Sequence, residues 1–112
     1  MGLILACKNR GLQRDLIIYD EDDAVITPTV NDVIRVKILR EGDTPKLTIT
    51  STANTANGSS LTKGATNRLR IDSSDMDLDP GTYTLLFDYY DNADSGGEWK
   101  CVDHHVFVIT ES

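Results

Sequence analysis

Helical periodicity, paired cysteines and long apolar runs are almost absent from this sequence. No window of about a dozen residues keeps apolar residues at i, i+3, i+4 and i+7, which argues against helices. The two cysteines, Cys7 and Cys101, lack CxxC spacing, and we expect buried free thiols, with a disulfide between the terminal strands as the alternative. The apolar run at the N-terminus follows no basic segment and is too short to span a membrane.

Signatures of catalysis are missing as well. The sequence has neither a GxSxG motif nor a glycine loop suited to a phosphate group. The only histidines, His104 and His105, are adjacent on a predicted strand, so they point to opposite faces and cannot readily share one metal ion. We therefore expect no catalytic residues, no metal site and no cofactor, and we expect that the protein is not an enzyme.

The acidic segment 75–79 begins like a calcium-binding EF-hand loop but does not continue like one. Pro80 precedes Gly81, and the twelfth position holds Leu86 where the bidentate glutamate belongs. Because proline presets its own φ and glycine permits a positive φ, the segment is better interpreted as a turn that leads into a strand. A looser calcium site between loops remains an alternative, and it would use either Asp20, Asp22 and Asp23 or Asp91 and Asp94.

The charge of the chain excludes two classes of partner. The formal net charge is −7 and the isoelectric point is about 4.6. A surface of this sign repels phosphate backbones and anionic lipid headgroups. We therefore expect neither nucleic acid nor a membrane as the partner.

What the sequence has in abundance is period-two alternation. In the segment 32–40, Ile34, Val36 and Ile38 fall on one face, whereas Arg35 and Lys37 fall on the other. Similar alternation predicts about seven strands, at 3–7, 15–20, 32–40, 45–51, 67–72, 82–90 and 98–110. This number and spacing favour an all-β fold, an antiparallel immunoglobulin-like β-sandwich.

The length and composition fit a single domain over residues 1–112. A chain of 112 residues can bury a sufficient core, and its 39% apolar content is above that of disordered chains. The segment 52–67 is rich in Thr, Asn, Gly and Ser, so we expect a flexible loop or an exposed hairpin with Asn57-Gly58 at its tip. Loops of this length are often functional, which makes this one a candidate partner contact.

The aromatic residues divide into two groups. Alternation places Tyr83, Phe87 and Tyr89 together on the predicted core face. Tyr90 and Trp99 lie off this alternation and beside a loop, where exposed rings can stack on sugars. These two residues are the candidate glycan contacts.

Several segments together resemble a known family. Their order is GDTPKLTIT, a Ser/Gly-rich loop, LRIDSSDM, DLDPGTYTLLFDYYDN and EWKCVDHHVFVI, from about Asp15 to Ile109. This order is similar to that of small immunoglobulin-like structural proteins of tailed bacteriophages, and it also resembles the N-terminal domain of phage baseplate upper proteins. A free-standing domain of this family implies a head decoration, or cement, protein.

The resemblance implies binding rather than turnover. The expected partner is the major capsid protein, with copies of the chain itself as a second candidate, and the expected location is the capsid surface after assembly in the host cytoplasm. A tail, baseplate or neck component and a glycan-binding or host-surface sandwich are the alternatives. We expect the partner contacts on edges and loops, at Gly2, Leu3, Lys8, Arg10, Arg35, Lys37, Asn57, Lys63, Arg68 and Arg70.

Overall fold

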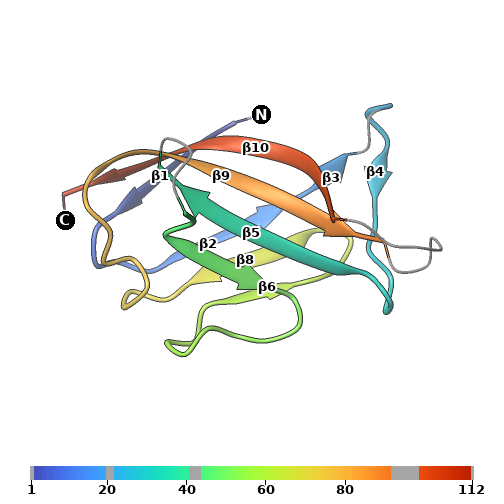
Figure 1. The fold of residues 1–112 in the computed structure, drawn as a ribbon, viewed down its shortest axis with the longest axis horizontal. Helices are drawn as coiled ribbons and strands as arrows, with labels where there is room; N and C mark the ends of the chain where they lie inside the picture. The colour runs from blue at the N-terminus through green and yellow to red at the C-terminus, as the bar shows by residue number, and fades with distance from the viewer. Residues whose placement is uncertain (1, 20–21, 41–43, 92–98, 112) are drawn as a thin grey trace.

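The computed structural model describes residues 2–19, 22–40, 44–91 and 99–111, except for the side chains of residues 101 and 102 (Figure 1). Its described residues form strands and no helix, which confirms the predicted all-β class. The strands are β1 (Leu3–Cys7), β2 (Leu12–Leu16), β3 (Ile18–Tyr19), β4 (Val25–Ile26), β5 (Val33–Leu39), β6 (Leu47–Thr50), β7 (Ser60–Thr62), β8 (Asn67–Ile71), β9 (Gly81–Tyr90) and β10 (Trp99–Thr110).

Two sheets face each other across one core. The larger sheet has the strand order β1-β10-β9-β5-β6, and the smaller has the order β2-β8-β7. A separate two-stranded sheet joins β3 to β4. Neighbouring strands are antiparallel everywhere except between β1 and β10, which run parallel.

Period-two alternation builds the core as predicted. Ile34, Val36 and Ile38 on β5 are fully buried, and Leu69 on β8 faces them from the smaller sheet. Strand β9 turns its alternate residues inward as well, namely Tyr83, Leu85, Phe87 and Tyr89. Apolar side chains on the inner faces of both sheets therefore share one core, and polar side chains are left on the outer faces.

Two details of the prediction are wrong, the strand number and the strictly antiparallel order. The predicted strand 15–20 is split at Ile17, where the chain leaves β2 in the smaller sheet and enters β3 in the separate two-stranded sheet. Two further strands, β4 and β7, occur where loops were expected. The turn after β1 carries the chain from one sheet to the other, so β1 does not form a hairpin with β2 and pairs in parallel with the last strand.

Cys7 also differs from the expectation. Its thiol is free but exposed, because Ile4 and Ala6 take the inward positions of β1. The side chain of Cys101 lies outside the described part of the chain. The last strand, by contrast, is continuous from Trp99 to Thr110, with a shift of register between Cys101 and Asp103 that marks a β-bulge.

The turn before β9 has the predicted character. Gly81 has a φ of +152°, and a Cβ there would lie 2.7 Å from Nη2 of Arg40. The hydroxyl of Tyr83 donates a hydrogen bond to the carbonyl of Asp79 over 2.6 Å and so fastens the strand to its own turn. The segment 75–82 therefore delivers β9 into the core at a fixed angle.

A matched pair of leucines on β9 tests this arrangement. Leu85 is fully buried, whereas its neighbour Leu86 is half-buried on the outer face. Leu85→Ala should lower the free energy of unfolding by about 2–5 kcal/mol, because it removes core contacts and leaves a cavity. Leu86→Ala should cost about 1 kcal/mol or less. Equal losses in urea unfolding would contradict the assigned faces of β9.

Candidate functional site

The outer face of the larger sheet carries a buried carboxylate held by two cations. Asp88 on β9 lies opposite Arg35 of β5, and its carboxylate accepts hydrogen bonds from Arg35 Nε over 3.0 Å and Nη2 over 2.8 Å. Nζ of Lys37 lies 3.3 Å from the same oxygen. The side chain of Asp88 is only 7% exposed, so the two predicted partner-binding cations are strongly engaged within the protein.

Aromatic rings extend this cluster. The guanidinium carbon of Arg35 lies 3.8 Å from the ring centroid of Trp99, and the rings of Trp99 and Tyr90 are 5.3 Å apart with an interplanar angle of 56°. The structure thus brings together four predicted site residues, Arg35, Lys37, Tyr90 and Trp99. They form, with Asp88, what we call the Trp99 cluster.

The geometry of the Trp99 cluster limits its use for sugar stacking. Trp99 is 40% exposed, but the guanidinium of Arg35 covers one face of its ring. Stacking on a sugar would require the other face or the displacement of Arg35. The assignment of Tyr90 and Trp99 as glycan contacts stays a prediction.

Trp99 is the single tryptophan of the chain, so its fluorescence reports on this cluster. Arg35→Ala should shift the emission to longer wavelength and increase quenching by acrylamide, because the indole face becomes open to water. Lys37→Ala is the matched control, since Lys37 contacts Asp88 through its ammonium group and Arg35 keeps its stack on Trp99. If both variants changed the spectrum equally, the Arg35 stack would not exist in solution.

Several side chains of the segment 52–67, which was expected to be a flexible loop or an exposed hairpin, form hydrogen bonds with the rest of the protein. The carboxylate of Asp75 accepts hydrogen bonds from Thr55 Oγ1 over 2.5 Å, from Ser59 Oγ over 2.5 Å and from Asn57 Nδ2 over 2.8 Å. Gly58 has a φ of +95° and closes the turn by donating its N–H to the carbonyl of Thr55. The segment crosses from the larger to the smaller sheet, where its later part forms β7 and pairs with β8 in an antiparallel hairpin, so Asn57-Gly58 lies in the preceding turn and not at the hairpin tip.

The ionisation of Asp75 supports this anchoring. Burial alone would raise the pKa of its carboxyl group, but the hydrogen bonds from Ser59, Thr55 and Asn57 bring the pKa below its ordinary value of 3.8. A carboxyl group whose pKa is lowered by folding stabilises the protein above its unfolded-state pKa. That stabilisation disappears as the pH falls through the folded-state pKa.

Asp75→Asn should therefore lower the free energy of unfolding by roughly 1–3 kcal/mol near neutral pH. The difference from the parent chain should be constant from about pH 5 to 8 and should shrink below about pH 4, as the pH falls toward the lowered pKa of the folded parent carboxyl group. Asp79→Asn is the control, because its side chain is exposed on the same segment. A difference that did not change with pH would show that the charge of Asp75 is not involved.

Lys63 also has a role inside the fold. Its ammonium group donates to the carbonyls of Thr29 over 2.9 Å and Asp32 over 2.6 Å, with a longer contact to Val30. The buried carboxylate of Asp32 accepts hydrogen bonds from the backbone and hydroxyl groups of Thr29 and from the hydroxyl of Tyr89. Burial alone would raise the pKa of Asp32, but the hydrogen bonds that its carboxylate accepts outweigh burial and lower the pKa below its ordinary value. Burial and the hydrogen bond to Asp32 raise the pKa of Tyr89.

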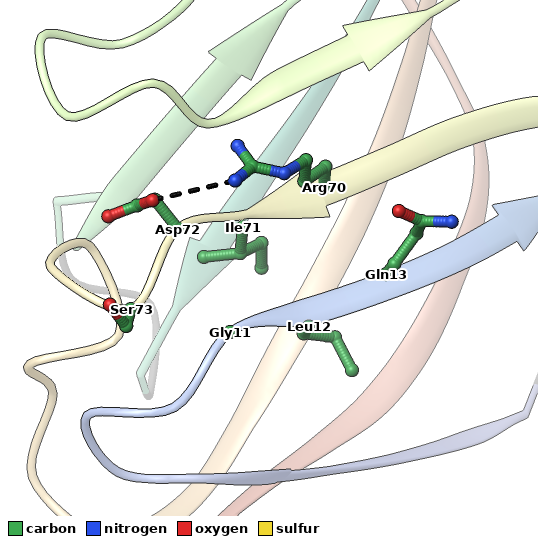
Figure 2. Close-up of a pocket in the computed structure, with 7 residues that line it drawn as sticks. All are labelled: Gly11, Leu12, Gln13, Arg70, Ile71, Asp72 and Ser73. Carbon is green, nitrogen blue, oxygen red and sulfur yellow. Dashed lines mark ion pairs between the residues drawn. The ribbon is translucent and has the colours of Figure 1, made fainter.

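Arg68 and Arg70 point outward from β8 as predicted. Arg68 lies 3.4 Å from Asp15, whereas Arg70 donates to the carbonyl of Gly58 over 3.0 Å and lies 3.7 Å from Asp72. Arg70 and Asp72 line a pocket of about 320 Å³ at the end of β8. Figure 2 shows their side chains pointing toward each other across an ion pair. Asn57 and Arg70 thus approach the same turn, and Arg68 adjoins them on the outer face of the smaller sheet.

The remaining predicted contacts lie near β1. Gly2, Leu3 and Arg10 are exposed, while Lys8 forms an ion pair of 3.0 Å with Asp77. The hydrogen bond that Lys8 donates to Asp77 raises the pKa of Lys8. Apart from Lys63, whose ammonium group contacts the carbonyls of residues 29–32, the predicted residues therefore occupy three separate regions, namely the Trp99 cluster, the outer face of β8 and the β1 edge.

Arg14 was not among the predicted contacts, although the sequence contains a signal for it. The alternate spacing of Leu12, Arg14 and Leu16 puts all three on the core-facing side of β2. An apolar residue would be expected at position 14, between the two leucines. Arg14 lies opposite Leu69 in the sheet and yet is exposed. A cation at a core-facing position indicates an opening between the two sheets.

The described residues contain no three His, Cys, Asp or Glu side chains placed to hold a metal ion. His104 is exposed and His105 half-buried, as expected for neighbours on a strand. Of the alternative calcium ligands, Asp20 and Asp94 lie outside the described residues. Asp22, Asp23 and Asp91 belong to no such group within them.

No family model matches the chain, and no curated protein is similar to it in sequence. Across the described ranges, no helix has the length and apolar character needed to cross a membrane. The function must therefore be argued from the surfaces described above.

Proposed function

We propose that this chain is a non-enzymatic structural protein of a tailed-phage virion. In this role it binds as a decoration protein to the assembled shell of the major capsid protein. Its place is the capsid surface, which it reaches after assembly in the host cytoplasm. The observation that carries the proposal is the strand order of the all-β sandwich, which supports the immunoglobulin-like fold implied by the family resemblance.

The strand order supports an immunoglobulin-like sandwich in two ways. The order β10-β9-β5 corresponds to strands G, F and C of one immunoglobulin sheet, and β2-β8-β7 corresponds to B, E and D of the other. In this correspondence β6 extends the first sheet beyond C, and β1 adds a parallel strand beyond G.

The hydrogen bond from Tyr83 to Asp79 provides independent support. Immunoglobulin-like sandwiches often carry a tyrosine corner, in which a tyrosine near the start of strand F bonds to the backbone a few residues upstream. Tyr83 occupies that position on β9 and bonds to a carbonyl four residues earlier. The PGTY segment on which the resemblance depends is therefore also the segment that forms the corner.

The surface suits binding to a repetitive partner. Leu3, Leu5 and Val106 are 55%, 62% and 40% exposed, and they lie together on the outer face because Leu3 pairs with Val106 in the sheet. Exposed apolar groups of this kind commonly mark protein contacts. A modest contact is sufficient, because a protein that binds the shell but not free subunits stabilises the shell by mass action.

Electron microscopy of gold-labelled chain on particles of the source phage tests the proposal. Label on heads is the expected result, and label on tails or baseplates would support the alternative location. Absence of label from particles, together with glycan binding lost in Trp99→Ala, would favour the third function, for which the neighbouring rings of Tyr90 and Trp99 are the supporting observation.

A charge-reversal variant tests which face of the chain contacts the shell. Arg68→Glu combined with Arg70→Glu should reduce cosedimentation with heads if the outer face of β8 contacts the shell, because both side chains are exposed. Lys100→Glu provides a control of the same sign on an exposed residue of β10. Unchanged binding by the double variant would remove the β8 face from the contact.

A further inference from the structure

Strand β1 forms one edge of the larger sheet, and no described strand pairs with its outer side (Figure 1). On its inner side, the N–H of Val106 donates to the carbonyl of Gly2 over 2.9 Å. The N–H of Lys8 donates to the carbonyl of Thr110 over 2.8 Å. Because only alternate residues of a parallel strand bond to a given neighbour, even-numbered positions of β1 face β10.

The odd-numbered positions, Leu3, Leu5 and Cys7, therefore direct their backbone groups toward the open side. The side chains of Leu3 and Leu5 are exposed on the outer face beside this row. The sequence of β1, LILAC, contains no charged residue and no proline. It thus lacks the features by which proteins usually protect a sheet edge from pairing.

The other edges of the two main sheets do have such features. Pro45 and Lys46 precede the four-residue strand β6, and β7 has only three residues. Strand β2 carries Arg14 and Asp15. An unprotected edge is therefore particular to β1 among these four.

A pocket of about 350 Å³ opens beside this edge, between β1 and β2. Its lining includes Ile4 from β1, Arg14 from β2 and His105 from β10. Arg14 and His105 both occupy core-facing positions of their strands, and Nη2 of Arg14 lies 3.5 Å from the carbonyl of Leu3. Asp15 in the lining is paired with Arg68, so Arg14 gives the pocket a cationic character.

We propose that the open edge of β1 binds an extended segment of a partner chain by strand addition, with an acidic side chain entering the pocket against Arg14. A strand added to β1 would direct the residue opposite Ile4 inward, toward Arg14. Its residues opposite Leu3 and Leu5 would point outward beside those leucines. The geometry thus selects an extended apolar-acidic-apolar segment, because backbone bonds supply affinity and the pocket supplies specificity.

Only the identity of the partner, a segment of a shell protein, rests on the proposed function. The test uses the whole chain without virions and the probe peptide acetyl-Thr-Thr-Val-Glu-Val-Thr-Thr-amide, followed by ¹H–¹⁵N spectra. The amide signals of Leu3, Leu5 and Cys7 should shift on titration to about 1 mM peptide, and these amides should become protected from exchange. Replacing Glu by Gln in the peptide should weaken binding about tenfold, because the charge-assisted bond to Arg14 is lost.

Two pairs of variants make the test specific. Leu5→Pro removes an N–H that faces the open side, which an edge strand tolerates, and it should abolish binding, whereas Leu5→Thr keeps the N–H and should retain it. Arg14→Glu should reverse the preference, so that a Val-Lys-Val peptide binds more tightly than Val-Glu-Val. This second pair decides the question even if Leu5→Pro does not fold, because Arg14 is an exposed residue.

Three results would overturn the inference. One is the absence of shifts in β1 amides at the highest peptide concentration, and another is an unchanged preference in Arg14→Glu. The third is a chain that is dimeric by analytical ultracentrifugation and becomes monomeric in Leu5→Pro, since a second copy would then occupy the edge. Peptide binding without label on phage particles would contradict only the proposed function, and label without peptide binding only the strand addition.

Discussion

The pairing of β5 with β9 is the constraint on which most of the structure depends. Opposing pairs such as Val36 and Phe87 place apolar side chains inward along both strands. The same register sets Asp88 opposite Arg35 on the outer face. A slip by one residue would bury charged groups and expose the core row, so burial fixes the register and the register creates the Trp99 cluster. Core packing therefore also determines which residues lie next to each other on the outer surface.

Much of the fold could be predicted from the sequence because alternation is a local property. The inward positions of β5, β8 and β9 follow directly from it, and so does the exposure of Arg68 and Arg70. Sheet membership does not, because it depends on where the chain crosses between layers. The parallel pairing of β1 with β10 joins residues about a hundred positions apart, and no local pattern records it.

The candidate site was predicted less well, for a related reason. Cations and carboxylates in a sequence suggest partners outside the molecule, yet Lys63, Asp75 and Asp88 find theirs within it. Asp75 holds a segment whose composition alone suggested flexibility, because one carboxylate can accept hydrogen bonds from several hydroxyl and amide groups. Conversely, the spacing of Leu12, Arg14 and Leu16 carried a signal for Arg14, but the position of β2 at the margin of the core is needed to interpret it.

The bulge in β10 has a consequence for the one tryptophan. Beyond the bulge, Phe107 and Ile109 face the core, and unbroken alternation would give Trp99 the same parity. The extra residue between Cys101 and Asp103 reverses that parity and brings Trp99 beside Tyr90 on the outside. If the same residues alternated without the bulge, the indole would turn toward the interior, so the register shift in this strand, as much as its composition, decides whether the protein has an aromatic surface.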